Sequence, residues 1–495
     1  MADFNAILLI SSALLLVAVV SVRLADRTGL PSLLIYLAVG VAVGEAGLGV
    51  RFSDYEITAE LGLLALALIL AEGGLTTRWA VVRPVLPFAT LLATLGVAVS
   101  VAVVAGLAYA VFDVDLRTAV ILGSIVASTD AAAVFSVLRK LPLRERVRAT
   151  LEAESGLNDA PVVVLVVLAA SDAWGSTSIL AGVGTVVLEL AGGLLLGLLL
   201  GMLGRQLLAR AALPVAGLYP LATVALCLVA FAAAQEVHVS GFLAVYVAAL
   251  VLGNSDLPHR RAVLGFAGST ALLAEAGLFV LLGLLASPDR LLPAVPGALL
   301  VGAGATFLAR PLAVALCALP FRLPWREQVF LSWAGLRGAV PIVIATIPVT
   351  QGLDGAERVL DVVFVLVVVY TLIQAPTLPW VGRRLGVVDP GQPLELELEV
   401  APLDEVHADV LQLRVGPDSL LHGVYIEELR LPTGAHVTLI VREGTSIVPG
   451  QHTHLVRGDQ VLVVATSSVR AQAEARLRAV ARGGRLARWN GETGE

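Results

Sequence analysis

Two carboxylates, an amide and a hydroxyl occur together in the run Glu154-Ser155-Gly156-Leu157-Asn158-Asp159. The run heads a stretch that continues to Ala170 without a charge, so it predicts acid groups at the start of a membrane-spanning helix. An ionised Asp at the centre of such a helix costs roughly 2.5–3.5 kcal/mol, and such groups usually face the bundle interior or an ion pathway. The run therefore favours a protein that moves ions.

Helical geometry divides this run into two faces. At about 100° per residue, Ser155 and Asp159 share one face, while Glu154 and Asn158 share the neighbouring face. A carboxylate with a hydroxyl one turn below offers oxygen ligands to a monovalent cation, although an acid that only braces the bundle is the alternative for Asp159. Glu154 needs a cationic partner, which favours a structural ion pair. The cationic side chains available in the spans are Arg310 and Arg337.

Two further signatures predict interrupted helices. Residues 128–130 read Ser-Thr-Asp ahead of good helix formers, which is typical of a helix that restarts within the membrane. Gly335 to Pro341 combines glycines and a proline around Arg337, and can break a second helix. Asp130 near one half-helix N-terminus and Arg337 near the opposing C-termini would neutralise the helix dipoles. Plain kinking with satisfied polar groups is the alternative.

The composition places these residues in a membrane protein. Hydrophobic residues make up 58% of the chain, charged residues 15%, and the mean hydropathy is +0.89, whereas soluble domains carry about 25% charged residues. We predict thirteen spans from apolar stretches long enough to cross the bilayer. They lie at residues 6–24, 30–49, 60–75, 85–112, 117–138, 151–171, 176–204, 216–235, 238–254, 266–286, 294–318, 327–349 and 359–381.

Loop charges predict the orientation. Arg and Lys concentrate in the loops of one side, and short cytoplasmic loops are the ones that carry such charges. The loops of the other side carry Arg51, Arg117, Arg290 and Arg358. The N-terminus is therefore expected outside and the C-terminus in the cytosol.

The composition changes at about Gly386, where the long apolar runs stop. Residues 394–400 alternate as a connecting strand, short β runs follow at 409–415, 436–442 and 460–465, and residues 468–480 have helical spacing. This pattern predicts a small cytoplasmic α+β module. The predicted divisions are a transmembrane domain at 1–385, a linker at 386–403, the module at 404–482 and a tail at 483–495.

The sequence gives little indication of a metal site or of an enzyme active site. Cys227 and Cys317 lie in apolar spans as small core residues, and His452 and His454 lack the partners of a metal site. A membrane enzyme would need a nucleophile–base pair or a metal cluster in the spans, so we expect no enzyme activity and no cofactor. Glu189 and Glu275 are expected to have packing or lipid-interface roles.

Five strings carry a resemblance to a known family: "STDAAAVFSVLR", "ESGLNDAPVVVL", "AEGGL", "FLARPLAVAL" and "SWAGLRGAVPIVIA". They resemble those of the monovalent cation:proton antiporters of the NhaP/NHE type. The resemblance implies an all-α polytopic fold of about thirteen helices in two inverted repeats, with two crossing broken helices, here spans five and twelve. It also implies a homodimer in the bacterial inner membrane.

The resemblance also implies roles for individual residues. Asp159 would carry the cation and the proton in turn. Further implied cation ligands are the backbone carbonyl of Thr129 and the side chains of Ser155 and Glu72. The remaining implied roles are support of the site by Asn158 and Asp130, an ion pair of Glu154 with Arg310, and helix-dipole compensation by Asp130 and Arg337. Asn158 in place of a second acid resembles the electroneutral members, which exchange one cation for one proton.

The cytoplasmic segment resembles the TrkA-C, or RCK-C, regulatory module through "VLQLRVGPDSLLHGVYIEELRLPTGAHVTLIVREG" and "VRGDQVLVV". Related modules dimerise and bind small regulatory ligands, including cyclic dinucleotides, so a regulatory nucleotide is an implied partner and nucleic acid is not. No G-x-G-x-x-G fingerprint precedes the module. Antiporters that bear such a module are often K+/H+ exchangers, which favours K+ over Na+.

Three alternatives remain open. A Na+(Li+)/H+ antiporter would use the same oxygen ligands. A cation channel gated by the C-terminal module would line a pore with the same acids, but no selectivity filter of repeated carbonyl rings is evident. A symporter of organic solutes would need a larger polar lining than the spans provide.

Overall fold

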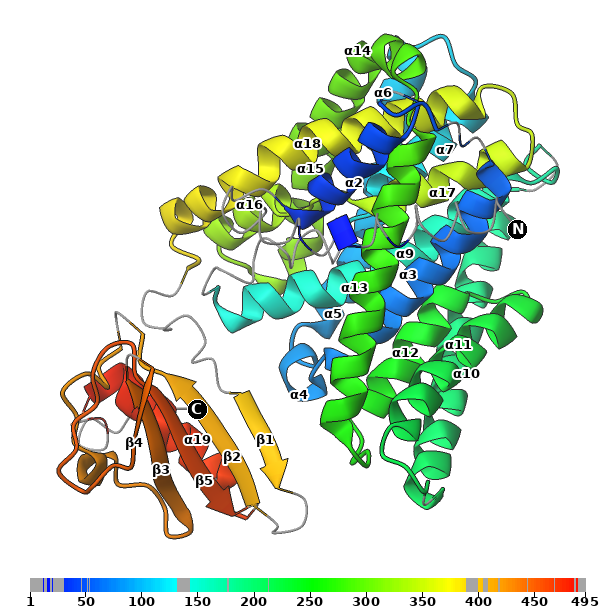
Figure 1. Cartoon of the computed structure of the whole chain (residues 1–495). Helices are drawn as coiled ribbons and strands as arrows, with labels where there is room; N and C mark the ends of the chain where they lie inside the picture. The colour runs from blue at the N-terminus through cyan, green and yellow to red at the C-terminus, as the bar shows by residue number, and fades with distance from the viewer. Residues whose placement is uncertain are drawn as a thin grey trace. The chain divides into compact units, whose positions relative to one another are not determined.

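The computed structural model describes residues 31–130, 143–388, 399–403 and 408–484, with short gaps inside these ranges and a few isolated positions outside them. It divides into two compact units, one formed largely by the residues up to Val387 and the other by the residues after it (Figure 1). The first unit is helical. The second is a small sheet with one long helix.

The described helices of the first unit begin at Ser32 and end at Leu385. In its first half they are α2 (Ser32–Val43), α3 (Tyr55–Thr76), α4 (Trp79–Val82), α5 (Leu86–Leu91), η1 (Leu92–Gly96), α6 (Val97–Val111), α7 (Leu116–Ala127), α9 (Glu145–Ala170) and α10 (Ile179–Arg210). The second half has α11 (Leu218–Glu236), α12 (Gly241–Gly253), α13 (Arg260–Leu285), α14 (Pro288–Gly304), η2 (Ala305–Ala309), α15 (Arg310–Ala318), η3 (Leu319–Phe321), α16 (Trp325–Trp333), α17 (Ala339–Thr350) and α18 (Ala356–Leu385).

Within the described ranges, eight helical segments are long and apolar enough to cross a membrane, and four shorter apolar helices accompany them. The predicted spans two to four and six to thirteen each coincide with a helix or a consecutive pair of helices. The fifth, residues 117–138, coincides with α7 as far as Ala127, and its residues 131–138 lie outside the described residues. The first predicted span, residues 6–24, lies almost entirely outside the described residues. The chain is a multi-pass membrane protein, and the total of thirteen stays a prediction.

One boundary differs from the sequence prediction in a way that matters for the site. Helix α9 begins at Glu145, well before the predicted start at residue 151. Its first turns are polar and include an i,i+4 ion pair between Arg148 and Glu152 at 3.0 Å. Hydropathy marks only the apolar part of such a helix. As a result Asp159 lies near the middle of the 26-residue α9, and not at its head.

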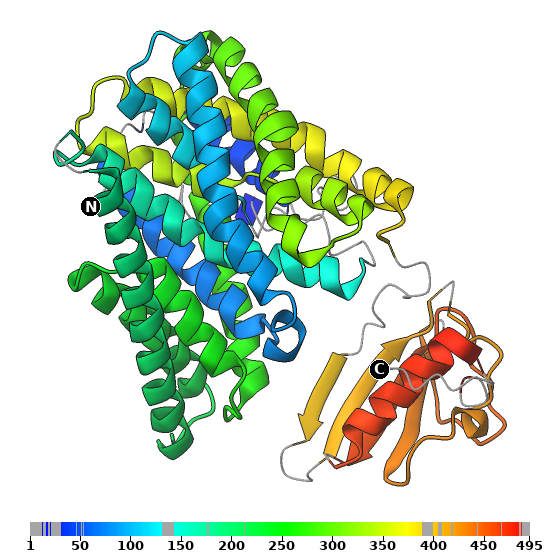
Figure 2. The same ribbon diagram turned by 180° about the vertical axis from the view of Figure 1, so that it is seen from behind.

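The helical unit contains two matched irregularities. The segments α5–α6 and α14–α15 each contain a π-helical turn, η1 and η2. Contacts run crosswise, because η1 packs against α15 and η2 packs against α6. Figure 2 shows α6 beside the α14–α15 segment from behind. This reciprocal packing is the arrangement that two inverted repeats predict.

Small residues bring the helices close together. A Cβ on Gly283 of α13 would lie 2.8 Å from the Cα of Gly40 in α2, so the two backbones touch where neither residue has a side chain. Without a hydrophobic driving force between helices in lipid, such close contact is a main source of stability.

The second unit is a five-stranded antiparallel sheet in the order β1-β2-β5-β3-β4. Its elements are β1 (Glu399–Leu403), β2 (Ala408–Arg414), η5 (Ile426–Leu429), β3 (Ala435–Arg442), β4 (Thr445–Ile447), β5 (Gln460–Thr466) and α19 (Arg470–Gly483). The predicted strands at 409–415, 436–442 and 460–465 and the predicted helix at 468–480 are confirmed. Strand β4 was not predicted, because three residues give too short a pattern.

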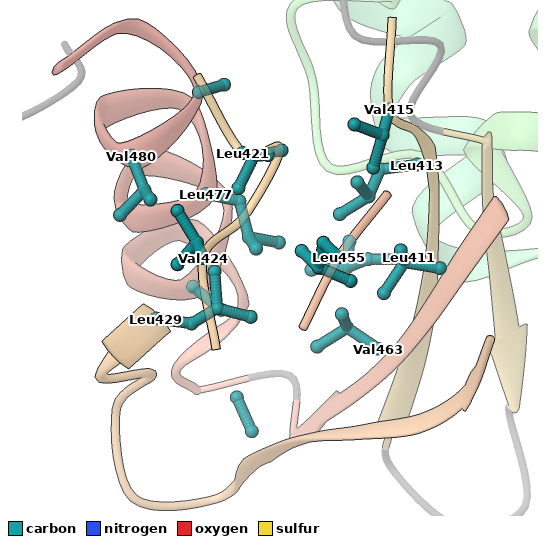
Figure 3. Close-up of a cluster of buried hydrophobic side chains, with 14 of the residues drawn as sticks. Leu411, Leu413, Val415, Leu421, Val424, Leu429, Leu455, Val463, Leu477 and Val480 are labelled. Atoms are coloured by element: carbon teal, nitrogen blue, oxygen red, sulfur yellow. The ribbon is translucent and has the colours of Figure 1, made fainter. Parts of the chain in front are cut away.

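The core of this unit lies between the sheet and α19 (Figure 3). Along β5 the buried residues alternate with partly exposed ones, as a strand with one covered face requires. Val463 of β5, Leu411 of β2 and Leu477 of α19 are all fully buried in this cluster. The module therefore has a hydrophobic core of its own.

An ion pair joins Arg442 at the end of β3 to Asp459 in the loop before β5. Burial raises the pKa of Asp459, but the Arg442 guanidinium at 2.8 and 2.9 Å and the Val456 N–H at 2.8 Å outweigh it and hold that pKa below its ordinary value. Asp459 has no exposed surface. The pair is thus part of the fold of the module, and its contribution to stability is lost as the pH falls through the lowered pKa.

Candidate ion-binding site

The candidate site lies where α9 passes the end of α7. Glu154, Ser155, Asn158 and Asp159 project from the middle of α9, and all four are buried, with Asp159 only 5% exposed. Gly156 sits between them, where a Cβ would lie 2.6 Å from Cε2 of Tyr246 in α12. The glycine lets α9 and α12 approach, so the polar residues are held inside the bundle.

Helix α7 ends at Ala127, Ser128 has an extended backbone, and residues 128–130 are not helical. Ser128 Oγ donates to Asp159 Oδ1 at 2.9 Å. Asn158 Nδ2 donates to Thr129 Oγ1 at 2.5 Å, and Thr129 Oγ1 lies 3.4 Å from Ser155 Oγ. The structure thus brings together four of the predicted residues, Thr129, Ser155, Asn158 and Asp159, in one cluster of oxygen and amide groups.

The break between α16 and α17 meets the end of α7 at this point. The backbone N–H of Asp130 donates to the carbonyl of Leu336, between α16 and α17, at 2.9 Å. The Asp130 carboxylate accepts from the N–H of Ala339, the first residue of α17, at 2.9 Å. The two breaks are therefore joined through both backbone and side-chain hydrogen bonds.

The charges at the crossing oppose the helix dipoles. Asp130 lies at the positive N-terminus of α17, while Arg337 Nε donates to the carbonyl of Val126 at the negative C-terminus of α7, at 2.8 Å. Thr371 of α18 donates to the carbonyl of Arg337 at 2.7 Å and fixes its backbone. An acid at an N-terminus and a cation at a C-terminus are each stabilised by the dipole. The positions agree with the roles implied for Asp130 and Arg337.

Glu154 is engaged elsewhere. Both of its carboxylate oxygens accept hydrogen bonds from the guanidinium of Arg310, the first residue of α15, with Nη2 at 2.6 Å from Oε2. The two side chains are 2% and 8% exposed. Arg310 also approaches the carbonyl of Leu331 in α16 at 3.4 Å. The pair ties α9 to α15 and neutralises the Glu154 charge.

Glu154 and Asn158 were expected on one face of α9 but with different roles, an ion pair for Glu154 and support of the site for Asn158. In the structure Glu154 pairs with Arg310, and the Asn158 amide donates to Thr129. Neighbouring faces of a helix differ by only about 100°, so a side chain of this length can serve the next face. Asn158 therefore belongs to the Asp159 cluster.

Three further acids, Glu72, Glu189 and Glu275, lie in α3, α10 and α13. Glu72 is partly buried near the C-terminal end of α3, and its carbonyl accepts from Thr76 at 2.9 Å. Helices α3 and α9 are in contact, but the ligand role of Glu72 stays a prediction. Glu189 and Glu275 lie partly exposed in α10 and α13.

Sequence reasoning missed Ser128 and Thr371. Ser128 stands in the Ser-Thr-Asp run, but the run was interpreted as a helix start and its first residue received no role. Thr371 lies within a long apolar helix and gives no local signal. Only the fold shows that each hydroxyl contacts a site residue.

The donor set suits a monovalent cation. One carboxylate surrounded by hydroxyl and amide groups supplies oxygen ligands with a single negative charge. Among the described residues there is no group of three or more His, Cys, Asp or Glu side chains placed to hold a metal ion. The site can therefore hold either a proton or one cation on Asp159.

Comparison with protein families gives two matches. The family model described as sodium/hydrogen exchanger, transmembrane, matches residues 12–384, and the model described as TrkA-C domain matches residues 410–478. The first covers most of the chain.

Similar proteins cover both parts of the chain. A K(+)/H(+) antiporter NhaP2 of Shewanella sp. (strain MR-4) is 36% identical over 479 residues, which is 93% of this chain and 81% of the relative. A K(+)/H(+) antiporter NhaP of Alkalimonas amylolytica is 34% identical, covering 94% of this chain and 82% of the relative. A Na(+)/H(+) antiporter NhaS2 of Synechocystis is 30% identical over 70% of this chain and 65% of the relative.

The fold has solved counterparts. The sodium proton antiporter MjNhaP1 from Methanocaldococcus jannaschii superimposes with a TM-score of 0.69 at 22% identity, covering 78% of this chain and 99% of that chain. At this identity the match shows the fold.

Proposed function

This chain belongs to the sodium/hydrogen exchanger family, and we propose that it is a secondary active antiporter that exchanges a monovalent cation, K+ in preference to Na+, for H+. The observation that carries the proposal is the position of Asp159. It is buried mid-helix, contacts the Ser128 hydroxyl, and has no cationic partner among the described residues. A buried carboxylate in that position binds a proton or a cation to balance its charge.

Coupling follows from competition at this one group. If Asp159 holds a proton or a cation but not both, the two ions compete, and movement of one down its gradient drives the other. Glu154 does not take part because Arg310 balances its charge. One cation then exchanges for one proton, and the exchange is electroneutral.

The interrupted helices supply the moving part. The helices α7 and α16 end at the site, so their terminal backbone groups face it and no long rigid helix formed by either of them runs across it. Other transporters also have their binding sites at broken helices. Movement of the crossed helices with α9 relative to the rest of the bundle would expose Asp159 to one side at a time. No continuous pore is required, which distinguishes this mechanism from a gated channel.

Support for K+ comes from the relatives. Both relatives named as K(+)/H(+) antiporters cover more than nine-tenths of this chain, including the C-terminal module. Na+, and with it Li+, is the second candidate for the transported cation. One relative is named as a Na(+)/H(+) antiporter, and the matching structure MjNhaP1 is named as a sodium proton antiporter.

The proposal extends to the setting of the protein. The loop charges support an inner-membrane orientation with the N-terminus outside and the C-terminal module in the cytosol. The module would regulate exchange by binding a small ligand such as a cyclic dinucleotide, and the working unit would be a homodimer. The role would be pH and K+ homeostasis, without enzyme activity or a resident cofactor.

The test is dissipation of a proton gradient in everted membrane vesicles. Addition of K+, Na+ or Li+ to vesicles with wild-type protein should dissipate the gradient, with the largest response to K+. Asp159→Asn should abolish the response to all three ions, because the amide cannot bind a proton or balance a cation. Glu152→Gln, on the same helix and paired with Arg148, should behave as the wild type. Activity in Asp159→Asn would overturn the proposal.

A further inference from the structure

The hydroxyl of Ser128 is the group in direct contact with the carrier carboxylate. Ser128 Oγ lies 2.9 Å from Asp159 Oδ1, and this is the side-chain hydrogen bond that Asp159 accepts among the described residues. Ser128 has no exposed surface and Asp159 is 5% exposed. Water therefore competes little with this contact.

The break in α7 directs this hydroxyl at Asp159. Ser128 caps the C-terminus of α7 with φ −63° and ψ 141°, so the backbone turns from helical to extended at this residue. Its N–H makes only a long bond of 3.4 Å to the carbonyl of Ile125. The local backbone therefore holds Ser128 loosely, while its side chain is held by the contact with α9.

Neighbouring hydroxyls are committed to other partners. Thr129 Oγ1 accepts from the Asn158 amide and lies beside Ser155 Oγ, so these three groups form a chain next to Asp159. Asn158 Oδ1 is fully buried and has no hydrogen-bond partner among the described residues. A buried acceptor without a partner is unfavourable, and a bound cation would supply the missing partner.

We propose that Ser128 is a further cation ligand of the exchange site. A serine hydroxyl both donates and accepts. In the empty, ionised site it donates to Asp159; when the cation binds, rotation about the Cβ–Oγ bond turns the proton away and presents the oxygen to the ion. When Asp159 is protonated, the same oxygen accepts a hydrogen bond from the carboxyl O–H. This inference rests on the proposed exchange function.

Removing the hydroxyl should weaken cation binding and spare the fold. In Ser128→Ala we expect the KM for K+ to rise about tenfold, the change that about 1.4 kcal/mol produces, with a small effect on the maximal rate. The stabilisation of the purified full chain by K+, measured as the rise in Tm with K+ concentration, should require correspondingly more K+. A merely structural role would lower Tm equally at every K+ concentration.

Ser124→Ala is the matched control. Ser124 lies one turn earlier in α7, is equally buried, and its hydroxyl has no partner within the described part of the chain. The variant should keep the wild-type KM and the wild-type response of Tm to K+. Ser128→Cys keeps about the same side-chain volume but replaces the oxygen by sulfur, a poor K+ ligand. It should also raise the KM for K+, and it provides the test if the alanine variant folds poorly.

The outcomes separate this inference from the proposed function. A wild-type KM and a wild-type Tm response in Ser128→Ala or Ser128→Cys would overturn the role of Ser128 while leaving exchange through Asp159 intact. Wild-type protein that neither exchanges K+ nor gains stability from it would instead overturn the proposed function.

Discussion

Two acids lie five positions apart on α9 in opposite electrostatic situations. Glu154 makes a bidentate contact with Arg310, whereas Asp159 contacts a hydroxyl. A carboxylate that is already neutralised gains little from a proton or a cation, so Glu154 is suited to hold the bundle together. In the proposed mechanism Asp159 binds both ions, because no guanidinium balances its charge among the described residues. Both acids are buried, so the presence or absence of a guanidinium partner is what distinguishes the structural acid from the proposed carrier.

Removal of either partner of the ion pair should affect stability more than exchange. Glu154→Gln or Arg310→Ala leaves an uncompensated charge between α9 and α15, which should cost about 3–5 kcal/mol. Thermal unfolding in detergent and the yield of membrane-inserted protein measure this loss. Exchange per folded molecule should stay close to that of the wild type.

The double variant Glu154→Gln with Arg310→Met is the control for this prediction. It removes both charges, so much of the lost stability should return. A folded single variant that has lost cation exchange would contradict the structural role and place Glu154 in the transport cycle.

At the scale of elements, the crossing of the two broken helices depends on one glycine. A Cβ on Gly338 would collide with the Asp130 carboxylate and lie 2.7 Å from its Cγ. That carboxylate accepts from the first N–H of α17, so the added methyl must displace the group that balances the helix end.

Gly338→Ala should therefore lower the exchange rate by at least about tenfold and destabilise the protein by about 1–3 kcal/mol, the usual range for overpacking. Vesicle assays and thermal unfolding measure the two effects. Gly106→Ala in α6, where an added Cβ meets no described atom within 4 Å, is the matched control and should leave both quantities unchanged. Normal exchange in Gly338→Ala would show that the Asp130 contact is dispensable.

The sequence alone predicted the elements much better than their contacts. Hydropathy located the spans, and polar residues, glycines and a proline in spans five and twelve indicated the breaks. The polar first turns of α9 were missed because hydropathy marks only the apolar part of a helix. The contact of Ser128 depends on a ψ angle of 141° at the end of α7, which no spacing rule encodes.

The whole molecule combines a transport unit with a module that has its own core. The module's sheet, its helix α19 and the Arg442–Asp459 pair are complete within the second unit. The family matches likewise end at residue 384 and begin again at residue 410. The exchanger family model thus matches the helical unit, and the TrkA-C domain is a separate unit.

The central claim is that one carboxylate serves both ions. The most direct measurement is the KM for K+ at a series of pH values, with radioactive Rb+ exchanging for K+ across proteoliposomes that have the same pH on both sides. Competition at Asp159 predicts that KM rises as the pH falls, approaching about tenfold per pH unit, while the maximal rate stays constant. If the maximal rate fell as the pH was lowered while KM stayed unchanged, the proton would bind a different group and the claim would be contradicted.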